Sequence, residues 1–316
     1  MPIARRALLA APALLPALAR AQAWPDRPIR LVVAFPAGTV TDTLMRHLSE
    51  PLARELGQPV IIDNRPGGSG VVGTESVARS APDGLTWCVL SVTNGALNTY
   101  LVPRLSYDPL KDFAPVGYVA DTAYVLVVPA ASPARDLRGF IELARRQPLT
   151  FSYGNASARI SSAMLARMAG AEMTAVPYRG GPEALTDVIA GRIDSTFTDF
   201  AAGMPQVKEG KVRALAVTSP QAFTLAPEIP PVASLLPGYA LSAWFGMGVP
   251  AATPAPIVAR ANAALNAALA DPAFIEKVGR LGYVPRGSTP GEFHGFLRGQ
   301  IAEMTTRAKE AGLEPG

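Results

Sequence analysis

Glycine, hydroxyl and acidic residues follow one another in a short segment near the start of the chain. Residues 35–42 read Phe-Pro-Ala-Gly-Thr-Val-Thr-Asp, after an apolar run that begins at Leu31. Leucines at helical spacing continue to Leu56, so we expect a helix with Thr41 as its N-cap and Asp42 in its first turn. The free N–H groups of such a helix start, with a dipole of about half a positive charge, attract a carboxylate or phosphate without lysine or arginine. A single loop of this kind also fits a helix start that binds nothing.

The same arrangement recurs in the second half of the chain. Three expected strands each end in a polar loop: Gly-Asn-Ala-Ser-Ala-Arg at 154–159, Arg-Gly-Gly-Pro at 179–182 and Thr-Asp at 198–199. Pro182 followed by Glu183 also favours a helix start. Loops at the strand ends of open α/β sheets meet at one crevice, where such sheets hold ligands. The recurrence therefore favours an anion site over a plain helix cap.

These loops require strands and helices that alternate along the chain. We expect strands over residues 29–35, 60–64, 86–92, 123–128, 149–153, 174–178, 193–197 and 212–218. We expect helices over residues 42–56, 71–80, 137–145, 160–168 and 183–190, and then 255–270, 273–281 and 290–311. Strand alternating with helix predicts an α/β fold with parallel sheets covered on both faces.

Two domains are expected, because roughly 290 residues exceed what one core usually holds. The apolar segments 123–128 and 242–249 are interpreted as two connections between lobes, with the final helices packing back on the first lobe. Domain I then comprises residues 24–125 and 243–316, and domain II comprises residues 126–242. Two crossings form a hinge, and a cleft between lobes is a preferred site for a small ligand.

Residues 1–23 have the pattern of a secretory signal peptide. Two arginines precede an apolar run at 7–18, and Ala-Gln-Ala at 21–23 fits a cleavage site. The run contains two prolines and is shorter than the roughly 20 residues that a membrane-spanning helix needs. We therefore expect cleavage and a soluble mature chain in a bacterial periplasm, with export by either the general or the twin-arginine route.

Charge and composition exclude several function classes. Without residues 1–23, Lys and Arg fall from 29 to 26 against 25 Asp and Glu, and the basic residues are scattered, which argues against nucleic-acid binding. Cys88 is the single cysteine and lies in an apolar run, where burial makes it unreactive. His47 and His294 have neither metal-ligand spacing nor a nearby nucleophile elbow. We therefore expect no metal, no cofactor and no enzymatic activity.

Two other sequence patterns indicate a function less specifically. Residues 68–73 read Gly-Ser-Gly-Val-Val-Gly, but residues 63–67 lie between them and the apolar part of the preceding strand, so we interpret them as a glycine-rich loop and not a dinucleotide site. The pair Trp244-Phe245 fits either a pocket wall or hinge packing. Acids near loops, such as Asp187 and Asp194, leave a secreted hydrolase as the alternative from another class.

The chain resembles the substrate-binding proteins of the tripartite tricarboxylate transporter system, the Bug or TctC family. The matching stretches run in family order over essentially the whole mature chain. They are residues 24–30, 33–38, 41–42, 63–67, 81–84, 107–115, 176–181, 214–218, 244–246 and 250. This resemblance implies a two-lobed, type II-like periplasmic-binding-protein fold whose lobes are joined by two crossing strands.

The resemblance also implies a function and a set of contacts. Such a protein, most simply a monomer, captures a di- or tricarboxylate, an acidic amino acid or an aromatic acid and delivers it to a membrane permease. A periplasmic sensor component that presents the same ligand is the alternative. By matching position, the ligand contacts would be Phe35, Ala37, Gly38, Thr39, Thr41, Asp42, Thr93, Asn94, Asn155, Ser157, Tyr178, Gly180 and Asp199.

The chain departs from the family pattern at two of these loops. Thr39 stands where members usually have a second glycine, which stiffens the loop and adds a hydroxyl. Arg159 stands where many members have histidine, and it could grip a ligand carboxylate or pair with a surface acid.

Overall fold

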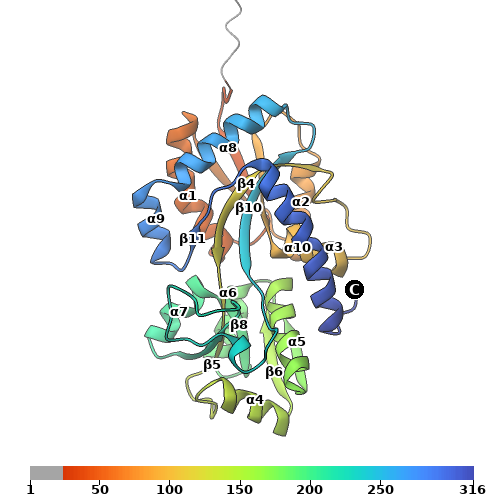
Figure 1. The fold of residues 1–316 in the computed structure, drawn as a ribbon, viewed down its shortest axis with the longest axis vertical. Helices are drawn as coiled ribbons and strands as arrows, with labels where there is room; N and C mark the ends of the chain where they lie inside the picture. Colours follow the sequence, from red (N-terminus) through yellow and green to blue (C-terminus); the bar gives the residue numbers. More distant parts are fainter. Residues whose placement is uncertain (1–23) are drawn as a thin grey trace, which may run out of the picture.

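Two β-sheets, each covered by helices, form an upper and a lower lobe (Figure 1). This computed structural model describes residues 24–316, so the signal peptide expected at residues 1–23 lies outside the described residues. Within residues 24–316, none of the helices combines the length and apolar character needed to span a lipid bilayer.

The upper lobe is built on a six-stranded sheet. Its strand order is β11 (Val284–Pro285), β4 (Phe113–Thr122), β10 (Ala243–Pro250), β3 (Thr86–Ser91), β1 (Ile29–Val33) and β2 (Val60–Asn64). Strand β1, between β3 and β2, runs parallel to both, whereas β10 is antiparallel to β3 and β4. Four of the five residues of β1 are buried, as expected of a parallel strand covered on both faces.

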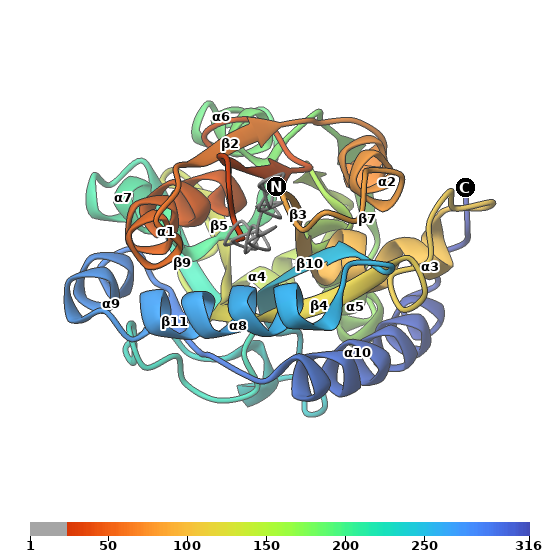
Figure 2. The same cartoon turned by 90° about the horizontal axis from the view of Figure 1, so that it is seen from above.

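Helices cover both faces of this sheet (Figure 2). One layer contains α1 (Val40–Leu56), α8 (Ala255–Leu269) and α9 (Pro272–Gly279), and the other contains α2 (Val71–Ala78), α3 (Asn98–Leu101) and α10 (Pro290–Glu310). Leu31 and Val33 pack in the same apolar cluster as α1 and α8, and Val32 packs with α2 and α10. Cys88 is fully buried as predicted, and burial raises the pKa of its thiol to about 12.

The lower lobe repeats this plan on five strands. Their order is β7 (Met173–Pro177), β6 (Leu149–Tyr153), β8 (Ser195–Asp199), β5 (Tyr124–Pro129) and β9 (Val212–Val217). Strand β6 is parallel to β7 and β8, and β5 is antiparallel to β8 and β9. The helices are α4 (Leu137–Arg146), α5 (Ala156–Ala169), α6 (Gly181–Ile189) and α7 (Phe200–Lys208).

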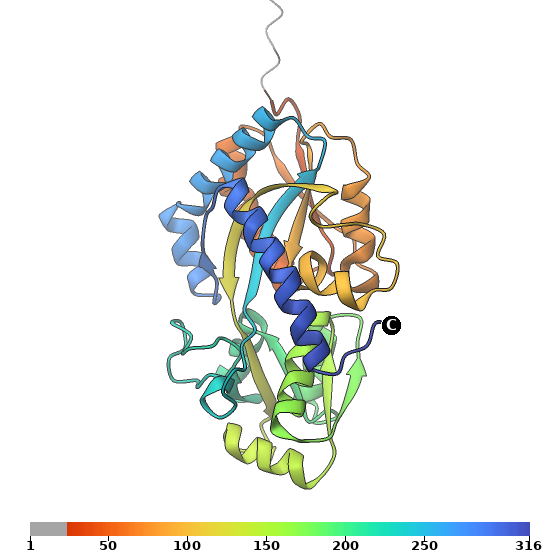
Figure 3. The ribbon, with the colours of Figure 1, turned by 45° about the vertical axis from the view of Figure 1, so that its right-hand side comes forward.

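Two strands connect the lobes. Strand β4 of the upper sheet ends at Thr122, and β5 of the lower sheet begins at Tyr124 after a single residue. The chain returns into β10 at Ala243, which pairs with Thr122. Figure 3 shows both crossings and also α10, which starts on the upper sheet and reaches α5 of the lower lobe.

The observed elements differ from the predicted ones at several points. Strand β8 covers residues 195–199, not 193–197, so Thr198 and Asp199 end a strand instead of starting a loop. Strand β4 and helix α7 were not expected, because Pro115 and Gly117 interrupt the apolar pattern of β4 and Pro205 lies inside α7.

Candidate ligand-binding site

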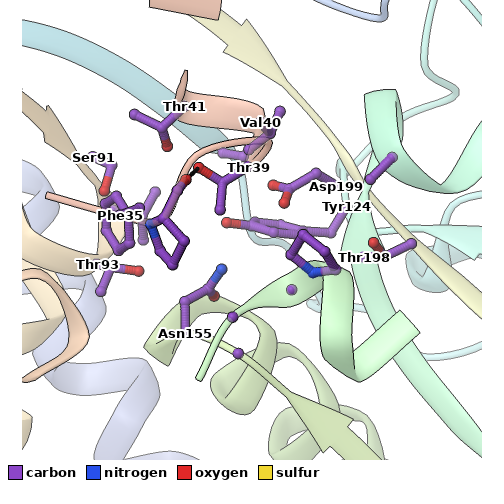
Figure 4. Close-up of a pocket in the computed structure, with 18 of the residues that line it drawn as sticks. Phe35, Thr39, Val40, Thr41, Ser91, Thr93, Tyr124, Asn155, Thr198 and Asp199 are labelled. Atoms are coloured by element: carbon purple, nitrogen blue, oxygen red, sulfur yellow. Dashed lines mark hydrogen bonds between the residues drawn. The ribbon is translucent and has the colours of Figure 1, made fainter. Parts of the chain in front are cut away.

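An enclosed cavity lies where the two lobes meet (Figure 4). Both lobes line it with strand ends and helix starts. It offers about 30 Å³ to the centres of water-sized molecules, enough for about two waters, so the lobes are nearly closed around it. Its lining residues are Phe35, Pro36, Gly38, Thr39, Val40, Thr41, Ser91, Val92, Thr93, Tyr124, Gly154, Asn155, Gly180, Gly181, Pro182, Thr198, Asp199, Ala202, Ala243, Trp244 and Phe245.

The start of α1 presents backbone donors to this cavity. Its N-cap is Thr39 and not Thr41, because the helix begins at Val40, and the Thr39 Oγ1 accepts a hydrogen bond from the Asp42 N–H at 3.5 Å. The Thr39 hydroxyl itself donates to the Pro36 carbonyl at 2.8 Å, which fixes the turn before the helix. Among the described residues, the N–H groups of Val40 and Thr41 have no acceptor. They are therefore available to an anion.

The lower lobe offers donors from two helix starts. Asn155 caps α5 by accepting from the Ala158 N–H at 2.8 Å, which leaves its amide NH₂ group free within residues 24–316 and directed into the cavity (Figure 4). Gly180 caps α6 without a side chain, and the Gly181 N–H has no acceptor in the described part of the chain. A Cβ on Gly154 would lie 2.1 Å from the Gly180 carbonyl carbon, so only glycine lets these two loops meet.

Asp42 supports the α1 loop from behind. Its carboxylate accepts hydrogen bonds from the Gly38 N–H, the Arg46 Nε and the Asn64 Nδ2, each at 2.9 Å. Burial alone would raise the pKa of Asp42, but these hydrogen bonds outweigh burial and lower it. Because these partners occupy the carboxylate and Asp42 does not line the cavity, the structure assigns it to loop geometry.

Thr93 and Ser157 connect the lobes. Their hydroxyl groups lie 3.0 Å apart, Thr93 on the segment after β3 and Ser157 on α5. Thr93 also lines the cavity, whereas Ser157 does not. Because it joins the two lobes, this hydrogen bond requires that they lie close together.

The other predicted contacts lie around the cavity without lining it. Asn94 is fully buried, with its amide bonded to Thr74, Val89 and Ser91. The guanidinium of Arg159 lies over the Tyr153 ring, 5.8 Å from its centroid. Ala37 is exposed and lines no part of the cavity. Tyr178 donates a hydrogen bond to Asp187 and lines an outer groove with the glycine-rich loop at residues 66–70; this groove adjoins the cavity, because Phe35, Pro36, Gly154 and Asn155 line both.

Several lining residues were missed from the sequence. Ser91, Tyr124 and Ala243 come from strand ends whose neighbours are far away in the sequence, so no local pattern marks them. Trp244 and Phe245 line the cavity and are also buried in the core. The pair therefore serves both as a pocket wall and in packing.

The electrostatics of the cavity come from dipoles and one acid. No lysine, arginine or histidine is among the described residues that line it. Asp199 is buried, and burial raises the pKa of its carboxyl to about 7. Residues 24–316 contain no cluster of three or more His, Cys, Asp or Glu side chains placed to hold a metal ion. The arrangement can hold a small anion through N–H, amide and hydroxyl groups.

Comparison with models of known protein families identifies the family to which this chain belongs. The sequence model described as "Tripartite tricarboxylate transporter family receptor" matches residues 44–312. The chain belongs to this family. The receptor is also 31% identical to Protein BugT of Bordetella pertussis over 300 residues, which cover 93% of this chain and 92% of BugT.

Two solved structures are similar to the receptor over nearly their full length. An R. palustris protein solved with adipate has a TM-score of 0.89 and 32% identity, covering 93% of this chain and all of that one. MatC from Rhodopseudomonas palustris, with bound malate, has a TM-score of 0.83 and 29% identity, covering 90% and 99%. The receptor therefore has the periplasmic-binding-protein fold and is a solute-binding protein.

Proposed function

We propose that the receptor captures a small carboxylate between its lobes and delivers it to the membrane permease of a tripartite tricarboxylate transporter. The observation that carries this proposal is the meeting of N–H groups from α1 and α6 with the Asn155 amide in one cavity; within residues 24–316 these N–H groups have no acceptor, and neither lysine nor arginine lines the cavity. Helix starts favour anions through both their free donors and their dipoles. The adipate and malate in the two related structures support the same ligand class.

The lobes act as two domains in this proposal. Residues 24–125 and 243–316 form domain I, and residues 126–242 form domain II, with the hinge where β4 passes into β5 and where the chain enters β10. A ligand that contacts both lobes stabilises the closed form, because it binds that form better than the open one. The closed form is then the one that the permease recognises, in the periplasm after removal of residues 1–23. No reaction is performed on the ligand.

A thermal-unfolding screen tests the ligand class. The receptor is heated with adipate, malate, succinate and citrate, and with glucose and putrescine as a neutral and a cationic control. A carboxylate at 100 times its dissociation constant stabilises the native state by about 2.7 kcal/mol, which raises the melting temperature clearly. Stabilisation by glucose or putrescine alone would overturn the carboxylate assignment, and mass spectrometry showing a converted ligand would overturn the binding-only role.

A further inference from the structure

Asp199 has an unusual position for a buried acid. It ends β8 and occupies the N-cap position of α7, yet its side chain makes no capping hydrogen bond. Its carboxyl group points instead into the cavity, as does the Tyr124 hydroxyl, below Thr39 (Figure 4). An aspartate at an N-cap normally accepts a hydrogen bond from the helix start. At this position the carboxyl group is directed at the space that a ligand would fill.

Apart from its own backbone N–H, the carboxyl group of Asp199 has no hydrogen-bond partner in the described part of the chain. Asp199 is 7% exposed, its Oδ1 is enclosed, and neither of its oxygens accepts a hydrogen bond from another described residue. Asp42 differs from Asp199 in this respect, because three donors hold the Asp42 carboxylate on the far side of the α1 loop. A buried polar group without a partner is rare in native proteins and points to a missing ligand.

The ionisable groups that face Asp199 are two tyrosines. Tyr124 comes from β5, and Tyr283 comes from the turn before β11, where its hydroxyl donates to the Val40 carbonyl at 2.7 Å. Asp42, on α1, faces away toward Arg46 and Asn64. No described cation lines the cavity, so no formal positive charge there pairs with a negative charge on Asp199. Burial raises the pKa of this carboxyl to about 7, into the range where it changes charge near neutrality.

We propose that Asp199 is a protonated carboxylic acid in the liganded receptor and donates a hydrogen bond to a carboxylate of the ligand, so that ligand capture takes up one proton. This inference rests on the proposed carboxylate function. Two ionised carboxylates in one enclosed site repel each other, and a shared proton removes this repulsion. Protonation also converts Asp199 from an acceptor into a donor, which is the group that an anionic ligand needs. The proton comes from solvent, and no covalent bond changes.

The sign of the pH dependence follows from this proton. The liganded receptor binds one more proton than the ligand-free, ionised receptor, so affinity falls as pH rises above the pKa of Asp199 in the ligand-free protein. The dissociation constant then increases by up to about tenfold for each pH unit, until the pKa of the liganded form is reached. Adipate and malate remain ionised throughout this range, because their carboxyl groups titrate at lower pH.

Isothermal titration calorimetry tests the inference with adipate and malate as probes, from pH 6 to pH 9. The dissociation constant should rise with pH, and titrations at pH 8 in HEPES and Tris, which differ in ionisation enthalpy, should report an uptake approaching one proton. Asp199→Asn supplies an N–H donor that cannot ionise, so its dissociation constant should change less than about twofold over the same range. Melting curves without ligand check that this variant is folded.

The other possible titration results would overturn the inference. A wild-type affinity that is independent of pH, with no proton uptake, overturns the inference and leaves the carboxylate function intact. An affinity that rises with pH also overturns it and makes Asp199 an ionised acceptor for a ligand hydroxyl or amino group. The wild-type titration decides between these outcomes even where the variant fails to fold. Failure of every carboxylate in the thermal screen overturns the proposed function, and the inference with it.

Discussion

At the scale of single residues, Asp42 shows how a buried acid can support a cavity loop without lining the cavity. The carboxylate holds the Gly38 N–H and the Asn64 amide, and it pairs with Arg46 on the same helix. Negative charge is acceptable at this place because Asp42 lies in the first turn of α1, where the helix dipole favours it. Asp42 therefore keeps the Val40 and Thr41 donors in position.

Replacing Asp42 with alanine should destabilise the receptor by about 2–3 kcal/mol, because three donors lose their acceptor. Since the pKa of Asp42 is lowered, its contribution is present above the ordinary carboxyl range and is lost as pH falls through the lowered value. Melting temperatures of wild type and variant should therefore differ at pH 7 and converge below about pH 4.

Glu50→Gln on the same helix is the matched control for this change. The Glu50 carboxylate lies 3.6 Å from Arg54 and is 79% exposed, so the loss should stay within about 0.5 kcal/mol. Equal losses for the two variants would show that Asp42 is no more than a surface charge.

At the scale of elements, local patterns predicted the site loops better than the whole cavity. Gly38, Thr39, Asn155 and Gly180 stand at strand-to-helix turns whose residue types mark them, and all four line the cavity. The N-cap of α1 was misplaced by two residues, because Thr39 and Thr41 are equally good caps and only the Pro36 turn selects between them. Tyr124 and Ser91 could not be predicted, since tertiary pairing of β5 and β3 alone brings them there.

The donors of α1 can be tested by removing one N–H group. Val40→Pro places proline at the first helical position, where its missing N–H and fixed φ are tolerated. Thr39 has φ −72° and ψ 162°, which a residue before proline adopts readily. Adipate or malate should bind roughly 10- to 100-fold more weakly by calorimetry, as expected for one charge-assisted hydrogen bond.

Val40→Ala is the control, because it keeps the N–H group and shortens the side chain. It should retain most of the affinity that Val40→Pro loses. Similar affinities for the two variants would exclude the α1 backbone as a ligand contact.

At the scale of the whole molecule, the two lobes meet through a hinge, a cavity and a direct hydrogen bond. The Thr93 and Ser157 hydroxyls lie 3.0 Å apart across the cleft. Ser157→Ala removes this bond without removing a group that lines the cavity. The closed state should lose about 0.5–1.5 kcal/mol, so ligand affinity should fall about two- to tenfold and the radius of gyration without ligand, from X-ray scattering, should increase.

Ser161→Ala provides the comparison for this prediction. The Ser161 hydroxyl donates to the Ser157 carbonyl within α5 at 2.8 Å, so its loss leaves the contact between lobes in place. If the radius of gyration rose equally in both variants, a change within α5, and not the loss of the contact between lobes, would be its cause.

The absence of lysine, arginine and histidine among the described residues of the cavity also affects how the receptor responds to its medium. Mobile ions screen exposed charges over about 10 Å at 0.1 M ionic strength, but they screen buried groups much less. Fixed peptide dipoles inside an enclosed cleft therefore keep their strength in dilute and in salty surroundings alike. We therefore expect the proposed carboxylate binding to depend less on ionic strength than binding by exposed lysine or arginine would.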